Sequence, residues 1–324
     1  MESEHESRGV GAFLPELILA AVVLIWASTF VITKDALDDF TPYSFIFARF
    51  SIILALSLSV LAVQSLGRGW RRMWHVDRAD LPRFVVSGLL GYTFYQIGFT
   101  VGLDHTSPFS SSLLIAMVPL FTLVLAALLG ERYPAGAWLG VLVAVTGVVV
   151  FLLDRQTGES SLLGNALSAG AAISFASYGL VNRPLVRKYA PTTVSAYTTL
   201  FGTVPLLLIA VPDARGQDWG ALDTSHWLML LYMAIFPIYL VYIGYNWVIS
   251  QRGVTATSAG LVVPVVSGIL SVIVFGESFG PLKIAGAVVV LAGLMLIQRT
   301  QMQMAKRARS AATPRQAAEA KATS

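Results

Sequence analysis

Residues 139–153 read LGVLVAVTGVVVFLL, a stretch in which Thr146 is the one polar side chain. A helix that is apolar on every side is typical of one surrounded by lipid. The whole chain has the same character, with 56% hydrophobic and 12% charged residues among 324, whereas soluble domains carry about 25% charged residues. At about 20 residues per span, the composition predicts an all-α polytopic membrane protein with about ten transmembrane helices.

Ten apolar stretches are expected to cross the bilayer. The first is not expected to be a signal peptide, because the residues before it are rich in glutamate instead of lysine and arginine. The expected spans are 14–34, 42–64, 81–102, 107–129, 132–153, 162–183, 192–212, 226–249, 254–276 and 280–298.

The distribution of lysine and arginine predicts the orientation, since these residues accumulate on the cytoplasmic side. With the N-terminus inside, 17 of the 22 basic residues fall on that side, 4 fall outside and Arg49 lies in a span. Both termini are therefore expected in the cytoplasm. The same rule explains the basic tail from Arg299 without a nucleic-acid partner, and the composition of 311–324 indicates little fixed structure. The oligomeric state stays open.

An internal repeat divides the chain. Trp26-Ala27-Ser28 matches Phe175-Ala176-Ser177 at an offset of 149, and Gly130-Glu131 matches Gly276-Glu277 at an offset of 146. Each half holds five spans, and because five is odd the halves must insert with opposite orientation, as in many secondary transporters. The expected organisation is a cytoplasmic tail 1–13, a first five-span repeat 14–153, a linker 154–161, a second repeat 162–298 and a basic cytoplasmic tail 299–324.

These motifs resemble the drug/metabolite transporter superfamily, specifically its ten-span EamA-type exporters. The resemblance rests on Trp26–Phe30 leading to Lys34, on Pro42 with Ala48-Arg49-Phe50, and on Pro119 before Gly130-Glu131, with counterparts in the second half. It implies export of amino acids, related small metabolites or amphipathic drugs across the inner membrane of a bacterial cell, with the bilayer and a small-molecule substrate as partners.

Two alternatives remain beside export. Relatives of this superfamily also act as permeases or exchangers of nucleotide sugars or phosphorylated metabolites. A polytopic membrane enzyme or scaffold is the alternative from another class, but the sequence has no His-Glu-x-x-His motif, no paired mid-span aspartates, no embedded histidine and no phosphate-binding loop. No catalytic residue, metal or cofactor is therefore expected.

Arg49 heads the candidate substrate-binding residues, because an ionisable side chain within a membrane is costly and often functional. It lies seven residues after Pro42, about 10 Å from the outer face at 1.5 Å per residue. If it faces a cavity, its guanidinium can bind a carboxylate through paired hydrogen bonds. The alternative is that it snorkels outward to Asp38 or Asp39.

Polar and aromatic residues at helical spacing complete the expected substrate site. Aromatic walls suit aromatic, aliphatic or cationic ligands, although helix packing and interhelical hydrogen bonds also explain such residues. The candidates are Trp26, Thr29, Tyr92, Tyr95, Gln96, Tyr178, Asn182, Tyr239, Tyr242 and Asn246.

Three further features concern the movement and packing of the spans. Pro119 and Pro264 are expected to kink spans four and nine, either as gating hinges or as fixed bends.

Gly136-x-x-x-Gly140 and the Gly140/Gly147 and Gly286/Gly293 pairs are expected to be packing surfaces. No aspartate or glutamate lies in mid-span, so proton coupling through a buried carboxylate is not expected.

Overall fold

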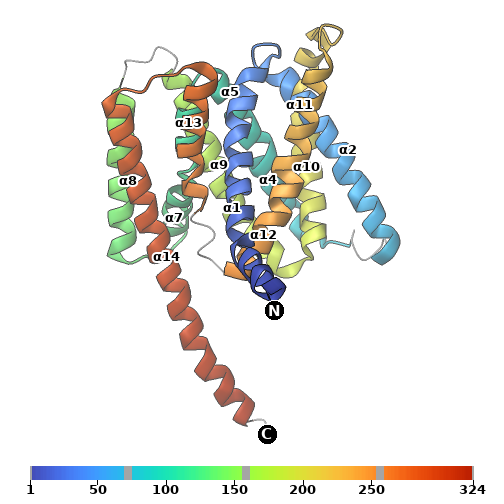
Figure 1. The fold of residues 1–324 in the computed structure, drawn as a ribbon. Helices are drawn as coiled ribbons and strands as arrows, with labels where there is room; N and C mark the ends of the chain where they lie inside the picture. The colour runs from blue at the N-terminus through green and yellow to red at the C-terminus, as the bar shows by residue number, and fades with distance from the viewer. Residues whose placement is uncertain (1, 69–74, 155–160, 253–258, 323–324) are drawn as a thin grey trace.

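The computed structural model describes residues 2–68, 75–154, 161–252 and 259–322. Every regular element in these ranges is helical, and the helices stand side by side in one bundle (Figure 1). The elements are α1 (Glu2–Ala36), α2 (Pro42–Arg68), η1 (Arg78–Asp80), α4 (Leu81–Gly88), η2 (Leu89–Phe94), α5 (Tyr95–Asp104), α6 (Pro108–Ile115), α7 (Val118–Leu128), α8 (Ala135–Leu153), α9 (Leu162–Lys188), α10 (Pro191–Gly216), α11 (Thr224–Ile235), η3 (Phe236–Leu240), α12 (Val241–Arg252), α13 (Val263–Phe275) and α14 (Pro281–Ala322).

Eight helices of the described chain are long and apolar enough to cross a bilayer, which confirms a multi-pass membrane protein. Two of the ten expected spans are not among them. The small and polar residues of α9 make it less apolar, and the span expected at 254–276 is described only from Ala259, as a shorter apolar helix. The eight are Phe13–Ala36, Pro42–Val63, Arg78–Asp104, Pro108–Leu128, Ala135–Leu153, Pro191–Gly216, Thr224–Ile249 and Pro281–Ala305.

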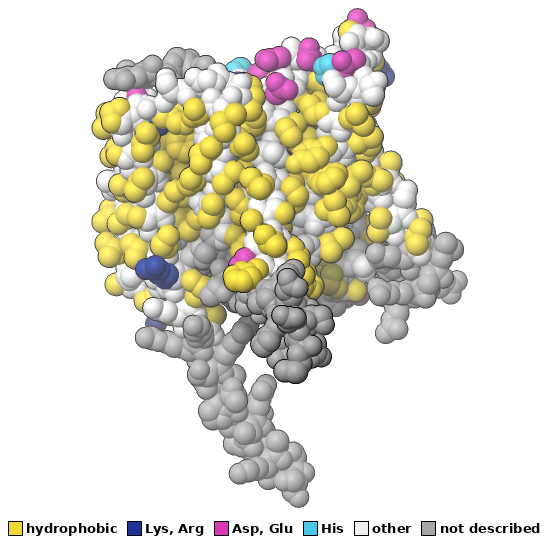
Figure 2. Space-filling model, in the orientation of Figure 1, with side chains coloured by type: hydrophobic (Ala, Val, Ile, Leu, Met, Phe, Trp, Pro, Cys, Tyr) yellow, Lys and Arg dark blue, Asp and Glu magenta, His cyan; other side chains and the backbone are white. Residues whose placement is uncertain are grey.

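The outer surface of the bundle matches a lipid environment. Large apolar side chains such as Leu128, Leu162 and Ile273 are more than 70% exposed, and Figure 2 shows apolar side chains covering the flank of the molecule. In the same view acidic side chains gather along the upper edge. This surface would be costly in water and is favourable in a bilayer.

Prolines and capping side chains explain where several helices begin. Pro42, Pro108, Pro191 and Pro281 occupy the first helical position, where the missing N–H costs no intrahelical bond. Ser107 caps α6 through the amide of Ser110, Ser161 caps α9 through the amide of Gly164, and Asp223 caps α11 through the amides of Ser225 and His226.

Pro119 and Pro264 also lie in first turns, those of α7 and α13. Span four is therefore two helices, α6 and α7, separated by a turn at Ala116 and Met117. Pro119 thus interrupts span four instead of bending a continuous helix, because proline has no N–H to donate to the carbonyl four residues earlier. Their role as hinges stays a prediction.

Both tails continue helices of the bundle. α1 begins at Glu2 and α14 continues to Ala322, and both ends leave the bundle on the same side (Figure 1). The expectation of little fixed structure over 311–324 is wrong as far as Ala322. Alanine, arginine, lysine and glutamine are good helix formers, and extension of an existing helix needs no new nucleus.

The glycine pairs form the contact between α8 and α14 within one chain. A β-carbon added at Gly140 would lie 2.8 Å from the carbonyl oxygen of Gly293, and one at Gly147 would collide with the backbone of Val290. Small residues thus let the two backbones touch, as in membrane helix pairs generally. Gly136 differs, because its nearest such neighbour is 3.5 Å away.

Candidate functional site

Two π-helical segments, η2 and η3, interrupt the helices of spans three and eight. At the repeat offset of 146, residues 90–94 correspond to η3, Phe236–Leu240. Single π-helical turns are rare and are frequent at functional sites. Tyr92 lies in η2, Tyr239 lies in η3, and Tyr95 and Gln96 follow directly after η2.

Pro237 explains how Arg49 is positioned. In an α-helix the carbonyl of residue 233 would accept a hydrogen bond from the N–H of residue 237, but proline has no N–H. The Nε of Arg49, on α2, donates to this carbonyl of Met233 at 3.3 Å. The second half of the chain therefore fixes the orientation of an arginine from the first half.

Arg49 is only 6% exposed. An arginine side chain has five N–H donors, and within the described residues only the one on Nε has a hydrogen-bond partner. The guanidinium carbon lies 5.8 Å from the ring centre of Phe50. No ion pair joins Arg49 to Asp38 or Asp39 among the described residues, which favours the interpretation that it faces the interior.

An aromatic cluster that includes Tyr95 lies on α5, which packs against α2, the helix that carries Arg49. The Tyr95 ring packs on Phe175 of α9 at 5.1 Å and stacks on Phe99 at 6.2 Å between ring centres. Trp26 of α1 belongs to the same apolar cluster and packs edge-on against Tyr245 of α12 at 5.2 Å. Elements from both halves thus meet near the buried guanidinium.

Gln96 and Thr29 are buried beside this cluster. Gln96 is 4% exposed and donates to Thr100 of its own helix at 2.8 Å, and Thr29 donates to the Trp26 carbonyl at 2.6 Å. Neither bond joins two helices. Gln96 therefore remains the better candidate of the two for substrate contact, because an amide has further donor and acceptor positions.

Other candidates hold helices together, as the alternative interpretation anticipated. The Tyr92 hydroxyl accepts from Thr199 at 2.9 Å, that of Tyr239 bonds Ser57 at 2.7 Å, and Asn182 accepts from Ser87 at 3.1 Å. Tyr178 bonds Asn182 at 3.3 Å. Asn246 is exposed, and the side chain of Tyr242 lies outside the described residues.

Two features of the ends of the bundle were not anticipated. Lys283 is 2% exposed, with its ammonium 5.3 Å from the ring centre of Phe279 and 5.7 Å from that of Phe151, so Arg49 is not the only buried cation.

A cavity of about 390 Å³ lies between α1 and α11, lined by Ile32, Asp35, Ala36, Asp39, Ser225, His226, Leu228, Met229 and Tyr232.

Replacing Pro237 by alanine would restore an N–H opposite the Met233 carbonyl and compete with Arg49 for it. We expect the melting temperature to stay level or rise, since proline within a helix costs about 3 kcal/mol. Transport is expected to fall several-fold because the guanidinium loses its support. Equal loss of stability and transport would contradict this account. Thermal unfolding and flux measured on the same preparation provide the check.

The family model for EamA-like transporters matches residues 14–153 and again residues 162–299. The chain belongs to the EamA-like transporter family. This family lies in the drug/metabolite transporter superfamily, so the resemblance found in the sequence is confirmed. The family and the names of relatives indicate a transporter and not an enzyme.

Curated relatives match this EamA-like protein over nearly its full length. An "Uncharacterized transporter" of Archaeoglobus fulgidus is 26% identical, covering 87% of this chain and 98% of the relative. A "Probable terminal-alkyne amino-acid exporter" of Streptantibioticus cattleyicolor is 28% identical, covering 91% and 96%. One solved crystal structure, 20% identical, superposes with a TM-score of 0.57 over 87% of this chain and 96% of the other, which supports the fold alone.

Proposed function

We propose that this protein is a secondary transporter that exports amino acids or related small metabolites bearing a carboxylate, with amphipathic drugs as a wider class. The observation that carries the proposal is the buried Arg49, whose Nε is anchored to the Met233 carbonyl while its other N–H groups have no protein partner in the described structure. A planar guanidinium with free parallel donors suits a carboxylate. The name of the Streptantibioticus relative, an amino-acid exporter, agrees with this substrate class.

We further propose ten spans in two inverted five-span halves, with alternating access between them. The family model matches twice, once in each half. The π-helical segments η2 and η3 occupy corresponding positions. Contacts also correspond, since α1 packs on α12 and α13 while α9 packs on α5 and α6. A substrate site between such halves is the usual arrangement in secondary transporters.

The proposed location is the inner membrane of a bacterial cell, with both termini in the cytoplasm. Support comes from the bias of basic residues toward one side of the expected spans and from the two chain ends lying on one side of the bundle (Figure 1). The bilayer and a small solute are the proposed partners, and no nucleic acid is proposed.

Flux into proteoliposomes tests the function. A panel of radiolabelled amino acids should show exchange or concentrative uptake that is absent from empty vesicles. A nucleotide sugar and a sugar phosphate serve as the second arm, and preferential flux of these would overturn the carboxylate assignment. Absence of flux for every small solute would contradict transport itself.

A further inference from the structure

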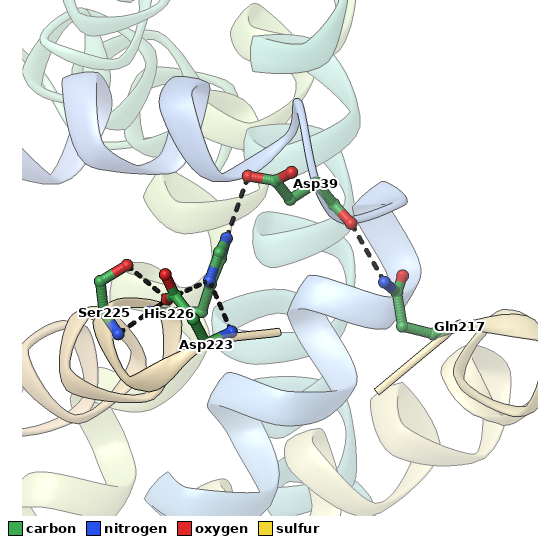
Figure 3. Close-up of polar contacts among 5 residues, drawn as sticks. All are labelled: Asp39, Gln217, Asp223, Ser225 and His226. Carbon is green, nitrogen blue, oxygen red and sulfur yellow. Dashed lines mark hydrogen bonds and ion pairs between the residues drawn. The ribbon is translucent and has the colours of Figure 1, made fainter. Parts of the chain in front are cut away.

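A cluster at the upper end of the bundle links the two halves of the chain. Nε2 of His226, in the first turn of α11, lies 3.0 Å from the carboxylate of Asp39, and Nδ1 lies 2.8 Å from that of Asp223 (Figure 3). Gln217 donates to the carbonyl of Asp39 at 3.0 Å. We call Asp39, Asp223 and His226 the His226 clasp.

A second cluster joins α9 to the residues before α4. Lys188, the last residue of α9, pairs with Asp77 and with Asp80, the latter at 2.6 Å, and the hydroxyl of Tyr189 donates to Asp80 at 2.6 Å. We call Lys188, Asp77 and Asp80 the Lys188 clasp. It too connects one half of the chain to the other.

The two clasps correspond through the repeat. An offset of 149 places Asp39 on Lys188, and an offset of 146 places Asp223 on Asp77 and His226 on Asp80. Asp77 and Asp223 each immediately precede the first residue of a helix, η1 and α11 respectively.

The apolar residues beneath the clasps correspond as well. Phe40 shares a buried cluster with Leu230, and Tyr189 shares one with Phe84. The offset of 149 relates Phe40 to Tyr189, and the offset of 146 relates Leu230 to Phe84. The same device is therefore built at both ends of the bundle, with the charges exchanged.

The chemistry of the two clasps differs in one respect. The hydrogen bonds that Lys188 donates to Asp77 and Asp80 hold the pKa of Lys188 well above its usual value, so the Lys188 clasp keeps its charge at every physiological pH. The His226 clasp has a positive charge only when the imidazole is protonated, and histidine titrates near neutrality.

We propose that the His226 clasp is a proton-operated latch that holds the upper end of the transporter closed, opposite a Lys188 clasp that does not respond to pH. The proposal rests on the alternating access proposed above. In this proposal the upper end of the bundle responds to pH through His226, whereas the opposite end, held by Lys188, does not.

The groups that face His226 determine the sign of the pH effect. Asp39 and Asp35 approach from the end of α1, Asp223 from its own helix cap, and the ring of Phe40 packs at 6.0 Å. Hydrogen bonds from Ser225 and His226 hold the pKa of Asp223 at about 2, so this carboxylate stays charged. An imidazole among carboxylates favours the protonated form.

When the imidazole of His226 is neutral, it can still make two hydrogen bonds of the His226 clasp. Its Nδ1 accepts from the Asp223 amide at 3.2 Å while Nε2–H donates to Asp39. On protonation Nδ1 gains a hydrogen, gives up the bond from the amide and donates instead to the Asp223 carboxylate 2.8 Å away. The Nε2–H bond to Asp39 becomes charge-assisted as well, and such bonds are stronger. The closed state is therefore favoured in acid, and this advantage is lost as the pH rises through and above the ordinary histidine range of about 6.5.

Spin-label distances test the latch directly, since the chain has no cysteine and labels attach only where cysteines are introduced. One pair is placed on the exposed residues Asp38 and Ala221 beside the His226 clasp. The matched pair is on their repeat equivalents, the exposed Arg187 and His75, beside the Lys188 clasp. Distances are measured on the reconstituted full chain without substrate from about pH 5.5 to about pH 8.5.

We expect the ratio of long to short distances for the Asp38/Ala221 pair to rise several-fold with pH, since one titrating group changes such a ratio by at most about tenfold per pH unit. His226→Gln should remove the pH dependence, and His226→Lys should keep the short distance throughout. An unchanged pH response in His226→Gln, or no response in the wild type, would overturn the proposal. Because no substrate is present, this failure is distinct from failure of the transport assay.

Discussion

Replacing Arg49 by lysine is expected to lower substrate affinity about 10- to 100-fold while the protein keeps its fold. Hydrogen bonds to charged groups contribute about 1.5–3 kcal/mol, and each 1.36 kcal/mol is a factor of ten. A lysine ammonium can satisfy the Met233 carbonyl, which Arg49 now binds at 3.3 Å, or a substrate carboxylate, but it lacks the planar fork that serves both.

The measurement is competition for flux in proteoliposomes, with thermal unfolding in parallel. Arg215→Lys is the matched control, because Arg215 is exposed at the end of α10. It should leave affinity and melting temperature unchanged. Wild-type affinity in Arg49→Lys would contradict bidentate recognition by this residue.

Replacing Gly140 by valine is expected to cause a large loss of folded protein. A β-carbon at this position would lie 2.8 Å from both the Gly293 carbonyl oxygen and the Ile297 side chain. Overpacking of a tight core costs about 1–3 kcal/mol or more, and the backbone of α14 cannot move aside without separating the helix pair. The melting temperature in detergent should fall by several degrees or more, with a lower yield of monodisperse protein.

Gly136→Val is the matched control for the glycine contact. Gly136 lies one turn earlier on the same helix, is exposed, and has its nearest neighbour for an added β-carbon 3.5 Å away at the hydroxyl of Thr300. Both variants make the same substitution on α8, Gly136 in its first turn and Gly140 one turn further in, so the difference between them reports chiefly the contact with α14. Equal stability of the two variants would show that the close contact is not a constraint.

The class of fold was readable from the sequence because lipid imposes a simple rule on every span. Apolar character around the whole helix, as in residues 139–153, identifies a span without knowledge of its neighbours. Two of the ten expected spans are not confirmed, each for its own reason. α9 contains small and polar residues that lower its hydropathy, and residues 254–258 of the ninth expected span lie outside the described structure.

The candidate site was only partly predictable. Arg49 stood out because charge within a span is rare, but its partner could not be found, since Met233 is 184 residues away and is marked only by a proline four positions later. Tyr92, Tyr239 and Asn182 share helix faces with plausible cavity residues, yet their partners lie on other helices. Helical periodicity gives the face of a residue and not the helix opposite it.

The repeat in the sequence relates the positions of the two clasps, but the sequence does not show which residues pair within each clasp. The offsets that match glycines and prolines also match Asp39 to Lys188 and His226 to Asp80. The residue types differ at these pairs, so a search for identity passes over them. The two clasps share the positions of their residues and the pairing of opposite charges, and the contacts in the structure show this pairing.

The most direct test of the central claim compares one amino acid with its amide in proteoliposomes. The two solutes differ in the carboxylate alone, so flux measures what Arg49 contributes. We predict transport of the acid, little transport of the amide, and loss of this difference in Arg49→Lys. Equal flux of acid and amide in the wild type would contradict the assignment of the buried Arg49 as the carboxylate-binding residue.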